Sequence, residues 1–379
     1  MDQHTLARSG TRFALRLMAE LRKQQPQQNV FISPLSIMLA LAMTANGAQG
    51  ETLRGMLDAL DLRGASLDDL NTGAVELLAL ARTDPQVQLS IANSLWGNRE
   101  VAFREDFLAR CRTVYGAEVS ALDFGAPASL DRINGWVAQQ TQDKIPTIIA
   151  QLNPADVLVL LNAIFFKGVW KTQFDPKLTR PFPFNLPGGV KKPHPLMNQS
   201  GKFDYAEYNT FEAIRLPYGA GDVNMYVLLP ARASHPADLL ATLDAQGWDT
   251  AIDGLRKREG MIALPRFTLE YAADLNKMLV ALGMGDAFDP GRADFGGMMP
   301  DAHGHGLAIS LVRHKTFLEV NEEGTTAAAA TAVMMTRSMS VGPRHPPFTM
   351  IVDRPFCCAI RDDRNGALLF LGAIMDPTV

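Results

Sequence analysis

The feature that most constrains this chain is an uncharged segment from Gly324 to Thr336, built only from Gly, Thr, Ala, Val and Met. Two acidic residues, Glu322 and Glu323, precede it, and Gly324 lets the backbone bend. Four consecutive alanines favour a helix, whereas the neighbouring threonines and valine favour a strand. As a strand, the segment has one small face, formed by alternate residues Thr325, Ala327, Ala329, Thr331 and Val333. It is therefore either a short surface helix with a loop, or a strand that can slide between two others.

A second constraint is the sequence Asn-Val-Phe-Ile-Ser-Pro-Leu-Ser-Ile at residues 29–37. Ser33 is placed to cap a helix whose first residue is Pro34, the favoured arrangement at a helix N-terminus. The following residues, up to Gly47, are almost uncharged. A helix that is apolar on all sides belongs in a protein core, so we expect this helix to be buried.

The most apolar run of the chain extends from Val157 to Trp170. It is too short to span a membrane, and its length and composition predict a central buried strand. Asn162 interrupts the run, and a polar side chain in a buried strand must find hydrogen-bond partners. The sequence therefore predicts a polar contact inside a sheet at Asn162.

The remaining sequence alternates between helical and strand patterns. Helical periods predict helices at residues 5–24, 51–83 (two helices, the second about 67–82), 105–115, 129–142 and 275–282. Strands are expected at residues 89–96, 197–205, 216–219, 223–230 and 262–267, and two final strands join at Asn365-Gly366. The pattern predicts an α+β fold with antiparallel sheets. No linker or repeat divides it, so we expect one domain over residues 1–379.

Composition excludes several kinds of partner. The net charge is −4 and the pI is near 6, so neither nucleic acid nor an anionic membrane is expected to bind. No run of eighteen apolar residues predicts a membrane helix. The N-terminal residues lack the pattern of a signal peptide, and Cys111, Cys357 and Cys358 show no disulfide or metal spacing. We therefore expect free thiols and a cytoplasmic protein, or a secreted one if the chain begins at a mature terminus.

An enzyme is the weaker hypothesis. The Gly-x-Ser-x-Gly motif does not occur, and no glycine-rich phosphate loop follows a strand. Cys111 with a distant histidine is a conceivable nucleophile without further support. His303 and His305 flank one glycine, but no third metal ligand has suitable spacing. We expect no cofactor and no metal.

The uncharged segment and its surroundings resemble a known family. Residues 319–332 read Glu-Val-Asn-Glu-Glu-Gly-Thr-Thr-Ala-Ala-Ala-Ala-Thr-Ala, which is similar to the hinge of the reactive centre loop in serpins. Residues 29–37, 46–52, 157–176 and 282–288 resemble other serpin motifs in consistent order, so the resemblance covers about residues 10–377. It implies the serpin fold, with about eight or nine helices around three largely antiparallel sheets. The exposed reactive centre loop would comprise about residues 323–347.

The resemblance also implies site residues. The hinge would consist of Glu322, Glu323, Gly324, Thr325, Thr326, Ala327, Ala328, Ala329 and Ala330. Ser33, Ser36, Asn162 and His314 match the family's shutter, where the main sheet parts, and Trp170 matches the breach, where insertion begins. Plain helix capping is a parallel role for the two serines. Thr326 departs from the usual glutamate, and Asp143 stands where the family usually has glycine, which puts the local turn in doubt.

A serpin would act as a suicide substrate for a serine protease. The protease cleaves the loop, the hinge segment inserts into the main sheet, and the acyl-enzyme is trapped. We expect a monomer without a heparin-type cofactor, because residues 67–82 contain one base, Arg82. The alternatives are a non-inhibitory chaperone or carrier, or an inhibitor of cysteine or elastase-like proteases. Bulky, charged or proline residues in the hinge would favour the first alternative, and this hinge lacks them.

Two arguments disagree about the cleaved bond. Arg337 is the side chain that trypsin-like proteases select, and it stands in an otherwise charge-free stretch. This predicts cleavage between Arg337 and Ser338 by a trypsin-like enzyme. The family's usual count of seventeen residues from Glu322 instead reaches Ser338, and therefore predicts cleavage between Ser338 and Met339.

Overall fold

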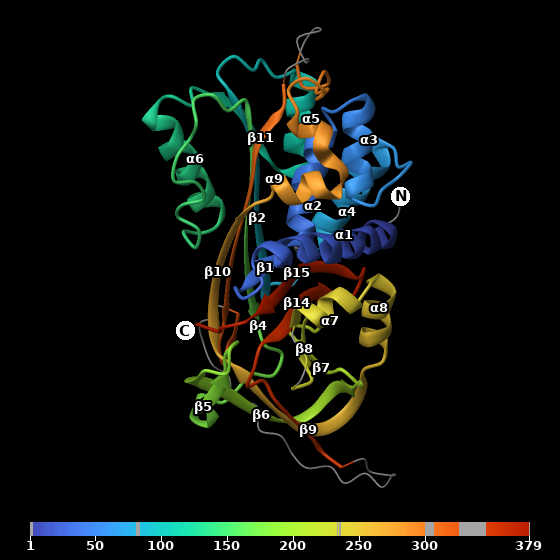
Figure 1. Ribbon diagram of the computed structural model, residues 1–379, viewed down its shortest axis with the longest axis vertical. Coiled ribbons are helices and arrows are strands. Elements are labelled where there is room, and N and C mark those ends of the chain that lie inside the picture. The colour runs from blue at the N-terminus through green and yellow to red at the C-terminus, as the bar shows by residue number, and fades with distance from the viewer. Residues whose placement is uncertain are drawn as a thin grey trace.

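In the computed structural model, the described part of the chain comprises residues 3–80, 84–232, 234, 236–299, 307–325 and 346–378. The α-helices within these ranges are α1 (Gln3–Gln24), α2 (Pro34–Ala45), α3 (Gly50–Ala59), α4 (Leu67–Leu80), α5 (Glu105–Tyr115), α6 (Pro127–Gln140), α7 (Pro236–Thr242), α8 (Ala245–Asp253) and α9 (Asn276–Leu279). Most of them gather at one end of the molecule, while α6 lies alone across the opposite side of a long sheet (Figure 1). The expected α+β fold is confirmed.

The long sheet runs along the molecule in the order β10-β11-β4-β2-β3, and a short sixth strand, β12, pairs with β4. Its strands are β10 (Phe267–Asp274), β11 (Ile309–Val320), β4 (Leu158–Val169), β2 (Val87–Asn98), β3 (Glu118–Leu122) and β12 (Gly324–Thr325). The apolar run predicted to be a central strand is β4. It pairs antiparallel with β2 and parallel with β11, an arrangement that requires long connections between the strands.

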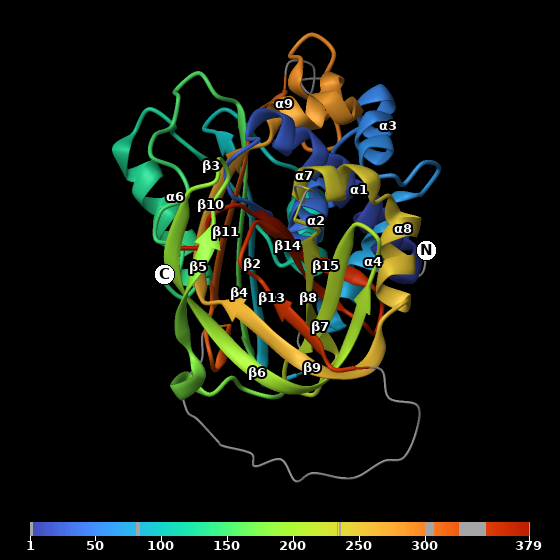
Figure 2. The same cartoon turned by 60° about the horizontal axis from the view of Figure 1, so that its bottom comes forward.

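The second sheet has nine strands, in the order β1-β15-β14-β8-β7-β6-β9-β13, with β5 on β6. They are β1 (Val30–Ile32), β15 (Ala367–Ile374), β14 (Phe356–Asp362), β8 (Val223–Pro230), β7 (Phe211–Pro217), β6 (Lys191–Glu207), β9 (Arg256–Pro265), β13 (Phe348–Ile351) and β5 (Arg180–Asn185). Strands β5, β6, β9 and β13 lie together at one end of the molecule (Figure 2). Two of the three expected sheets are thus continuous, because the 17-residue β6 pairs with β7 at one end and with β9 along much of its length.

Helix α2 is the centre of the core. Ser33 caps it as predicted, and every residue from Pro34 to Ala45 is buried. The helix packs against β4 and β2 on one side and β15 on the other. A smaller apolar cluster fills the space between α6 and the opposite face of the long sheet, with Ile133 and Val137 against Val159 and Leu161. Each such fully buried aliphatic side chain stabilises the fold by about 1.5–3 kcal/mol.

Local differences from the expectations have simple causes. The helix expected at 275–282 is regular only to Leu279 and then widens into a π-helical turn, in which Gly283 has φ 113°. The expected short strand at 197–205 is part of the longer β6, since its residues pair on both sides. Asp143 has φ 58°, so it adopts the left-handed conformation that a glycine would take, which aspartate tolerates better than most residues. Arg82 lies outside the described residues.

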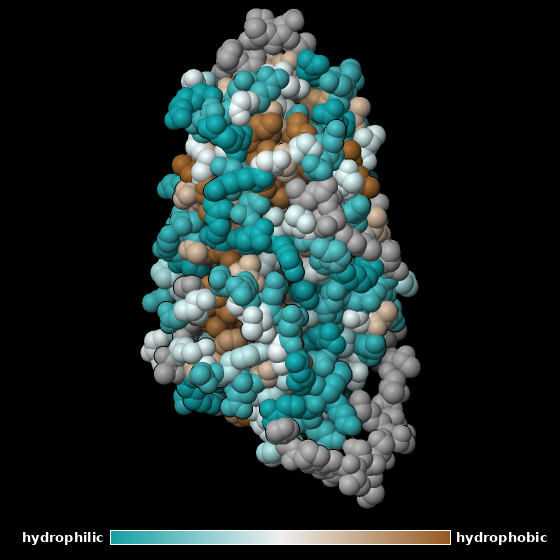
Figure 3. All heavy atoms as spheres, turned by 90° about the vertical axis from the view of Figure 1, so that its right-hand side faces the viewer, coloured by the Kyte–Doolittle hydropathy of each residue, from teal (hydrophilic) through white to brown (hydrophobic). Residues whose placement is uncertain are grey.

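The described helices include none that is long and apolar enough to cross a membrane. The face in Figure 3 is mostly hydrophilic, with small separate apolar patches. Several polar side chains are nevertheless buried within the long sheet, among them Asn93, Asn162 and His314.

Candidate functional site

A row of polar side chains crosses the middle of the long sheet. Asn93 of β2 is directly opposite Asn162 of β4, and Asn162 is directly opposite His314 of β11. All three are at most 2% exposed. Side chains at directly opposed positions point to the same face of a sheet, and this face is the one covered by α2. The polar contact predicted at Asn162 is therefore present, and it extends over three strands.

Hydrogen bonds join this row to the start of α2. Asn162 accepts from Nδ1 of His314 and donates its two amide protons to Ser36 and Asn93. The Ser33 N–H donates to Nε2 of His314 at 3.0 Å, while Oγ of Ser33 accepts from the Ser36 N–H at 3.3 Å. The four shutter residues named from the sequence are thus brought together. Asn93 completes the group, and we call these five residues the shutter cluster.

Burial fixes the charge of His314. The ring is fully buried, which lowers the pKa of His314 to about 3, because a charged imidazolium loses its hydration inside the protein. The neutral ring donates from Nδ1 and accepts at Nε2. Protonation would turn Nε2 into a second donor facing the Ser33 N–H. The shutter cluster therefore requires a neutral histidine, and every group of Asn162 has a partner only in this state.

The pairing of β4 with β11 stops part of the way along the sheet. The two strands pair from Leu158 and Ile309 to Phe165 and Phe317, with one irregularity between Ile309 and Leu311. Beyond this point β4 continues to Val169, and it is β12 that pairs with it there, antiparallel, with Thr325 opposite Gly168. The uncharged segment thus begins as a strand at the place where two long strands separate. We call residues 321–325 the seated hinge.

Trp170 holds the seated hinge from the end of β4. Its indole N–H donates to the Asn321 carbonyl at 2.9 Å, and its backbone N–H donates to the Glu323 carbonyl at 3.0 Å. The indole stacks on Tyr218 with a centroid distance of 4.2 Å and an interplanar angle of 11°. The Tyr218 hydroxyl bonds the Thr325 hydroxyl at 2.9 Å, and both side chains are fully buried. Thr325 therefore points into the core.

Glu322 is a third point of attachment. It is 8% exposed and accepts from the Thr179 hydroxyl at 2.8 Å, while its carbonyl accepts from the Phe174 N–H at 2.9 Å. Arg266 lies 4.0 Å from the same carboxylate. A buried carboxylate with a hydroxyl donor and a nearby guanidinium is well compensated. Glu322 thus anchors the chain just before Gly324 through both its side chain and its backbone.

The predicted site residues divide into two groups. Ser33, Ser36, Asn162 and His314 meet in one cluster. Of the first hinge residues, Glu322 to Thr325, Trp170 bonds the backbone of Glu323. The others lie outside the described residues: Thr326, Ala327, Ala328, Ala329, Ala330, Arg337, Ser338, Met339, His303 and His305. Sequence reasoning missed Asn93, Asn321 and Tyr218. Asn93 could have been found as a polar residue in an alternating strand, whereas Tyr218 gave no signal because it is distant in sequence from Trp170 and Thr325, which it contacts.

Among the residues that the structure describes, neither a cluster of metal ligands nor a reactive thiol is present. Within the described ranges, no set of three or more His, Cys, Asp or Glu side chains is arranged to hold a metal ion. All three cysteines are free and buried. Burial raises the pKa of the Cys111 thiol and of the Cys358 thiol to about 12, so neither forms the thiolate that a nucleophile needs. The arrangement is instead suited to a change of strand pairing.

Comparison with known proteins shows which family the chain resembles over nearly its whole length. Residues 8–377 match the family model described as serpin (serine protease inhibitor). Leukocyte elastase inhibitor of Sus scrofa is 37% identical over 385 residues, covering 98% of this chain and 99% of that protein. Serpin B8 of Homo sapiens is 38% identical over 375 residues, covering 96% and 97%. The crystal structure of tengpin, a thermophilic serpin in the native state, superposes with a TM-score of 0.89 at 31% identity, covering 99% and 95%.

These matches, together with the separated strands and the seated hinge, define a protease inhibitor rather than a catalytic enzyme. The chain belongs to the serpin family.

Proposed function

We propose that this protein inhibits serine proteases as a suicide substrate, and that the segment following Thr325 inserts between β4 and β11 after cleavage. The observation that carries the proposal is the pairing of β12 with β4. The first two residues of the uncharged segment already form a strand at the opening between β4 and β11, so insertion extends an existing ladder. No new strand has to be nucleated.

The register of β12 indicates where the segment would lie. Continued antiparallel pairing from Thr325 and Gly168 places Thr331 opposite Asn162 and Met335 opposite Leu158. Thr325 faces the core, so the residues at even spacing from it would face the core as well. These are Ala327, Ala329, Thr331 and Val333, the small face that the sequence pattern predicts. At the level of the shutter cluster the inserted strand would thus supply a threonine hydroxyl.

Insertion would also improve the pairing of the sheet. The parallel contact between β4 and β11 would be replaced by antiparallel contacts on both sides of the new strand, and parallel pairing is slightly less stable per residue. The exchange leaves a net gain of roughly ten backbone hydrogen bonds at about 1 kcal/mol each, a total on the order of 10 kcal/mol. This free energy is available only once cleavage has released the segment.

A protease attached to the cleaved loop as an acyl-enzyme would be carried along the sheet. Displacing its catalytic groups by about 1 Å is enough to slow deacylation about 100-fold. The covalent complex would then persist. The three free buried cysteines support an intracellular, reducing compartment for this reaction.

We propose a trypsin-like target that cleaves between Arg337 and Ser338. Arg337 is the one charged side chain between Gly324 and Val341, and a carboxylate in the protease pocket would bind it as a charge-assisted pair. Cleavage between Ser338 and Met339 by an elastase-like enzyme is the second candidate. It is supported by the family's residue count from Glu322 and by the name of one relative, leukocyte elastase inhibitor.

The test is to mix the protein with trypsin and, separately, with pancreatic elastase. We expect a protease complex that survives boiling in detergent, and no such complex with a protease whose catalytic serine is chemically blocked. Mass spectrometry of the released C-terminal fragment assigns the bond, since the fragment would begin at Ser338 for the first candidate and at Met339 for the second. Cleaved inhibitor with fully active protease, for several serine proteases, would contradict the inhibitory function.

A further inference from the structure

A cavity of about 360 Å³ adjoins the residues that hold the seated hinge. One wall is the segment from Trp170 to Phe174, which follows β4. The other walls come from residues 199–204 of β6, residues 215–217 of β7, the turn at 220–222, and Lys257 of β9. None of the hydrogen bonds of the shutter cluster reaches it. The cavity is therefore separate from the shutter, although it shares Trp170 with the breach.

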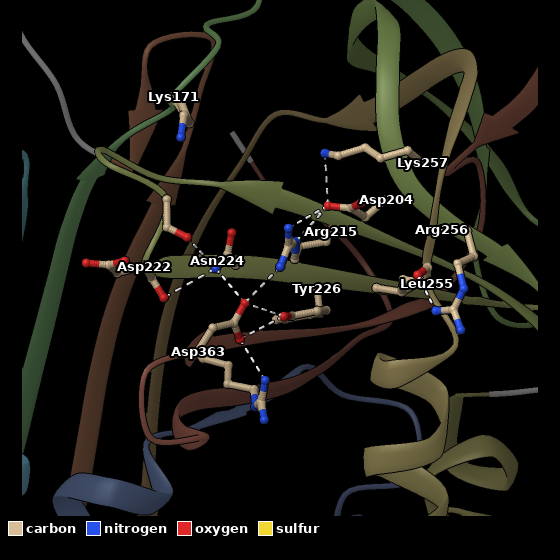
Figure 4. Close-up of polar contacts among 12 residues, drawn as sticks. Lys171, Asp204, Arg215, Asp222, Asn224, Tyr226, Leu255, Arg256, Lys257 and Asp363 are labelled. Carbon is tan, nitrogen blue, oxygen red and sulfur yellow. Dashed lines mark hydrogen bonds and ion pairs between the residues drawn. The ribbon is translucent and has the colours of Figure 1, made fainter.

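The cavity carries more positive than negative charge. Four cations line it, Lys171, Lys202, Arg215 and Lys257, against two carboxylates, Asp204 and Asp222. In Figure 4, Lys171 and Lys257 stand on two sides of a space that has Arg215 at its base. These cations come from three strands and from the segment after β4, so their approach is produced by the tertiary fold.

The positive charges that line the cavity are only partly neutralised by carboxylates. Asp204 is directly opposite both Arg215 and Lys257 in the sheet, and it accepts from the two at 3.0 and 3.1 Å. One carboxylate thus serves two cations, although Arg215 also reaches Asp363 at 3.2 Å from behind. The ammonium of Lys171 donates to the Ala220 carbonyl at 2.6 Å, which is a neutral acceptor.

Lys202 and Asp222 are the two remaining charged residues that line the cavity. Lys202 lies 3.9 Å from Glu259, and both side chains are more than half exposed, so the pair is weak. Asp222 is at the 220–222 turn, which is fixed from below because the Asn224 amide donates to the carbonyls of Gly221 and Asp222. An anion that enters the cavity therefore meets Lys171 and Lys257, and Asp204 and Asp222 are the carboxylates among the lining residues.

The remaining lining is mixed, with the polar residues Thr172, Gln199 and Ser200 beside aromatic and aliphatic ones. Trp170, Phe174 and Phe203 contribute ring surface, and Leu216 and Pro217 contribute aliphatic surface. Trp170 and Phe174 are in edge-to-face contact at 6.0 Å, so they form a rigid wall. Pockets of a few hundred Å³ that combine some apolar surface with a few placed polar and charged groups are typical of sites for small molecules.

We propose that this cavity is a binding site for small aromatic anions, and that its occupation stabilises the seated hinge. The rings of Trp170 and Phe174 would contact the aromatic part of the ligand, and Lys171 and Lys257 would bind its acidic groups. The same two aromatic residues donate their backbone N–H groups to the carbonyls of Glu323 and Glu322. A ligand that fixes their positions favours the state in which the hinge is attached.

Calorimetry with a rigid probe, naphthalene-1,5-disulfonate, tests the binding site without any protease. We expect saturable binding of one probe per chain. The variants Lys171→Gln and Lys257→Gln should each weaken it at least tenfold. The control Lys277→Gln, which removes an exposed lysine of α9, should leave it unchanged. Sulfate and naphthalene-1,5-diol, which carry only the charge or only the rings, should bind at least tenfold more weakly.

Binding that is equally strong in the two cavity variants and in the control would overturn the site, as would binding that does not saturate. Hydrogen–deuterium exchange tests the coupling to the hinge. At a probe concentration ten times its dissociation constant, exchange of the Trp170 and Phe174 amides should slow about tenfold, because the ligand binds only the attached state. Unchanged exchange of these two amides at saturation would refute the coupling, whatever the outcome with proteases.

Discussion

The two halves of the opening between β4 and β11 are built differently. At the shutter cluster, Asn162 and His314 pair across the strands, and α2 supplies further partners. At the breach, β4 and β11 are unpaired beyond Phe165 and Phe317, and the seated hinge occupies the gap through Trp170 and Tyr218. The first half is closed by side chains, whereas the second is closed by the backbone of the seated hinge, where the uncharged segment begins.

This difference indicates how a sheet can be stable and still admit a strand. Buried hydrogen bonds hold the half that contains the shutter cluster together, because a buried polar group that loses its partner costs about 1–3 kcal/mol. An incoming strand that brings its own hydroxyl, Thr331 in the proposed register, can replace these partners without leaving an unpaired group. The breach needs no such exchange, since its gap is already filled by Gly324 and Thr325.

The largest effect is expected from Thr325→Arg at the breach. The Thr325 side chain is fully buried against Tyr218, and an unpaired guanidinium there costs several kcal/mol. Insertion should then become slower than deacylation, so the yield of covalent protease complex should fall at least tenfold, as measured on denaturing gels. Thr325→Ser, which keeps the hydroxyl, is the matched control. An undiminished yield in the arginine variant would show that the hinge is misaligned.

The next effect concerns the shutter cluster. In His314→Ala, the Ser33 N–H and the Asn162 carbonyl oxygen lose their partner inside the core. Two unsatisfied groups and a cavity should lower the free energy of unfolding by about 3–6 kcal/mol in urea titrations. The exposed His4 provides the control, because His4→Ala should change it by less than about 0.5 kcal/mol. If the free energy of unfolding fell by less than about 1 kcal/mol in His314→Ala, the side chains of the shutter cluster would not be what holds β4 and β11 together.

A smaller effect is expected from pH. The pKa of His314 is about 3 in the folded protein and about 6.5 in an unfolded chain. Between these values the unfolded chain binds the extra proton, so stability falls as the pH is lowered through this window. The slope reaches about 1.4 kcal/mol per pH unit. Urea titrations from pH 7 to pH 4 measure it, and a His314→Gln variant should show a shallower slope. Equal slopes would mean that other groups cause the dependence.

The smallest change in overall stability is expected from Gly324→Ala. Gly324 has φ 148°, and a Cβ there would lie 2.1 Å from the Gly168 carbonyl oxygen. The seated hinge should then detach from β4, so the Trp170 and Phe174 amides should exchange at least tenfold faster with deuterium. The free energy of unfolding should fall by less than about 2 kcal/mol. Gly135→Ala in α6, where a Cβ meets nothing within 4 Å, is the control. Unchanged exchange in Gly324→Ala would show that attachment of the hinge does not depend on the close approach of Gly324 to the Gly168 backbone.

Much of the fold could be predicted because its signals are local. The cap at Ser33, the apolar run of β4 and the turn at Asn365-Gly366 each depend on a few adjacent residues, and all three are confirmed. The continuous second sheet could not be predicted, because β6 joins it by pairing with two strands that are distant in sequence.

The candidate site shows the same limit. The motifs identified Asn162 and His314, since polar residues in apolar strands are visible in the sequence. Tyr218 was not identified, although its hydroxyl is the partner of Thr325. Tyr218 lies more than one hundred residues before the hinge, and no pattern in the sequence links the two.

The sequence by itself determined the membership of the family, the small uncharged face of the hinge segment and the buried helix beneath the sheet, because each depends on residue type and short-range periodicity. Only the tertiary structure decided that Asn93 joins the shutter cluster and that the hinge is already seated on β4. It also decided that cations from four separate segments surround one cavity beside Trp170. These features depend on strand register, and register is set by contacts between residues that are far apart in the chain.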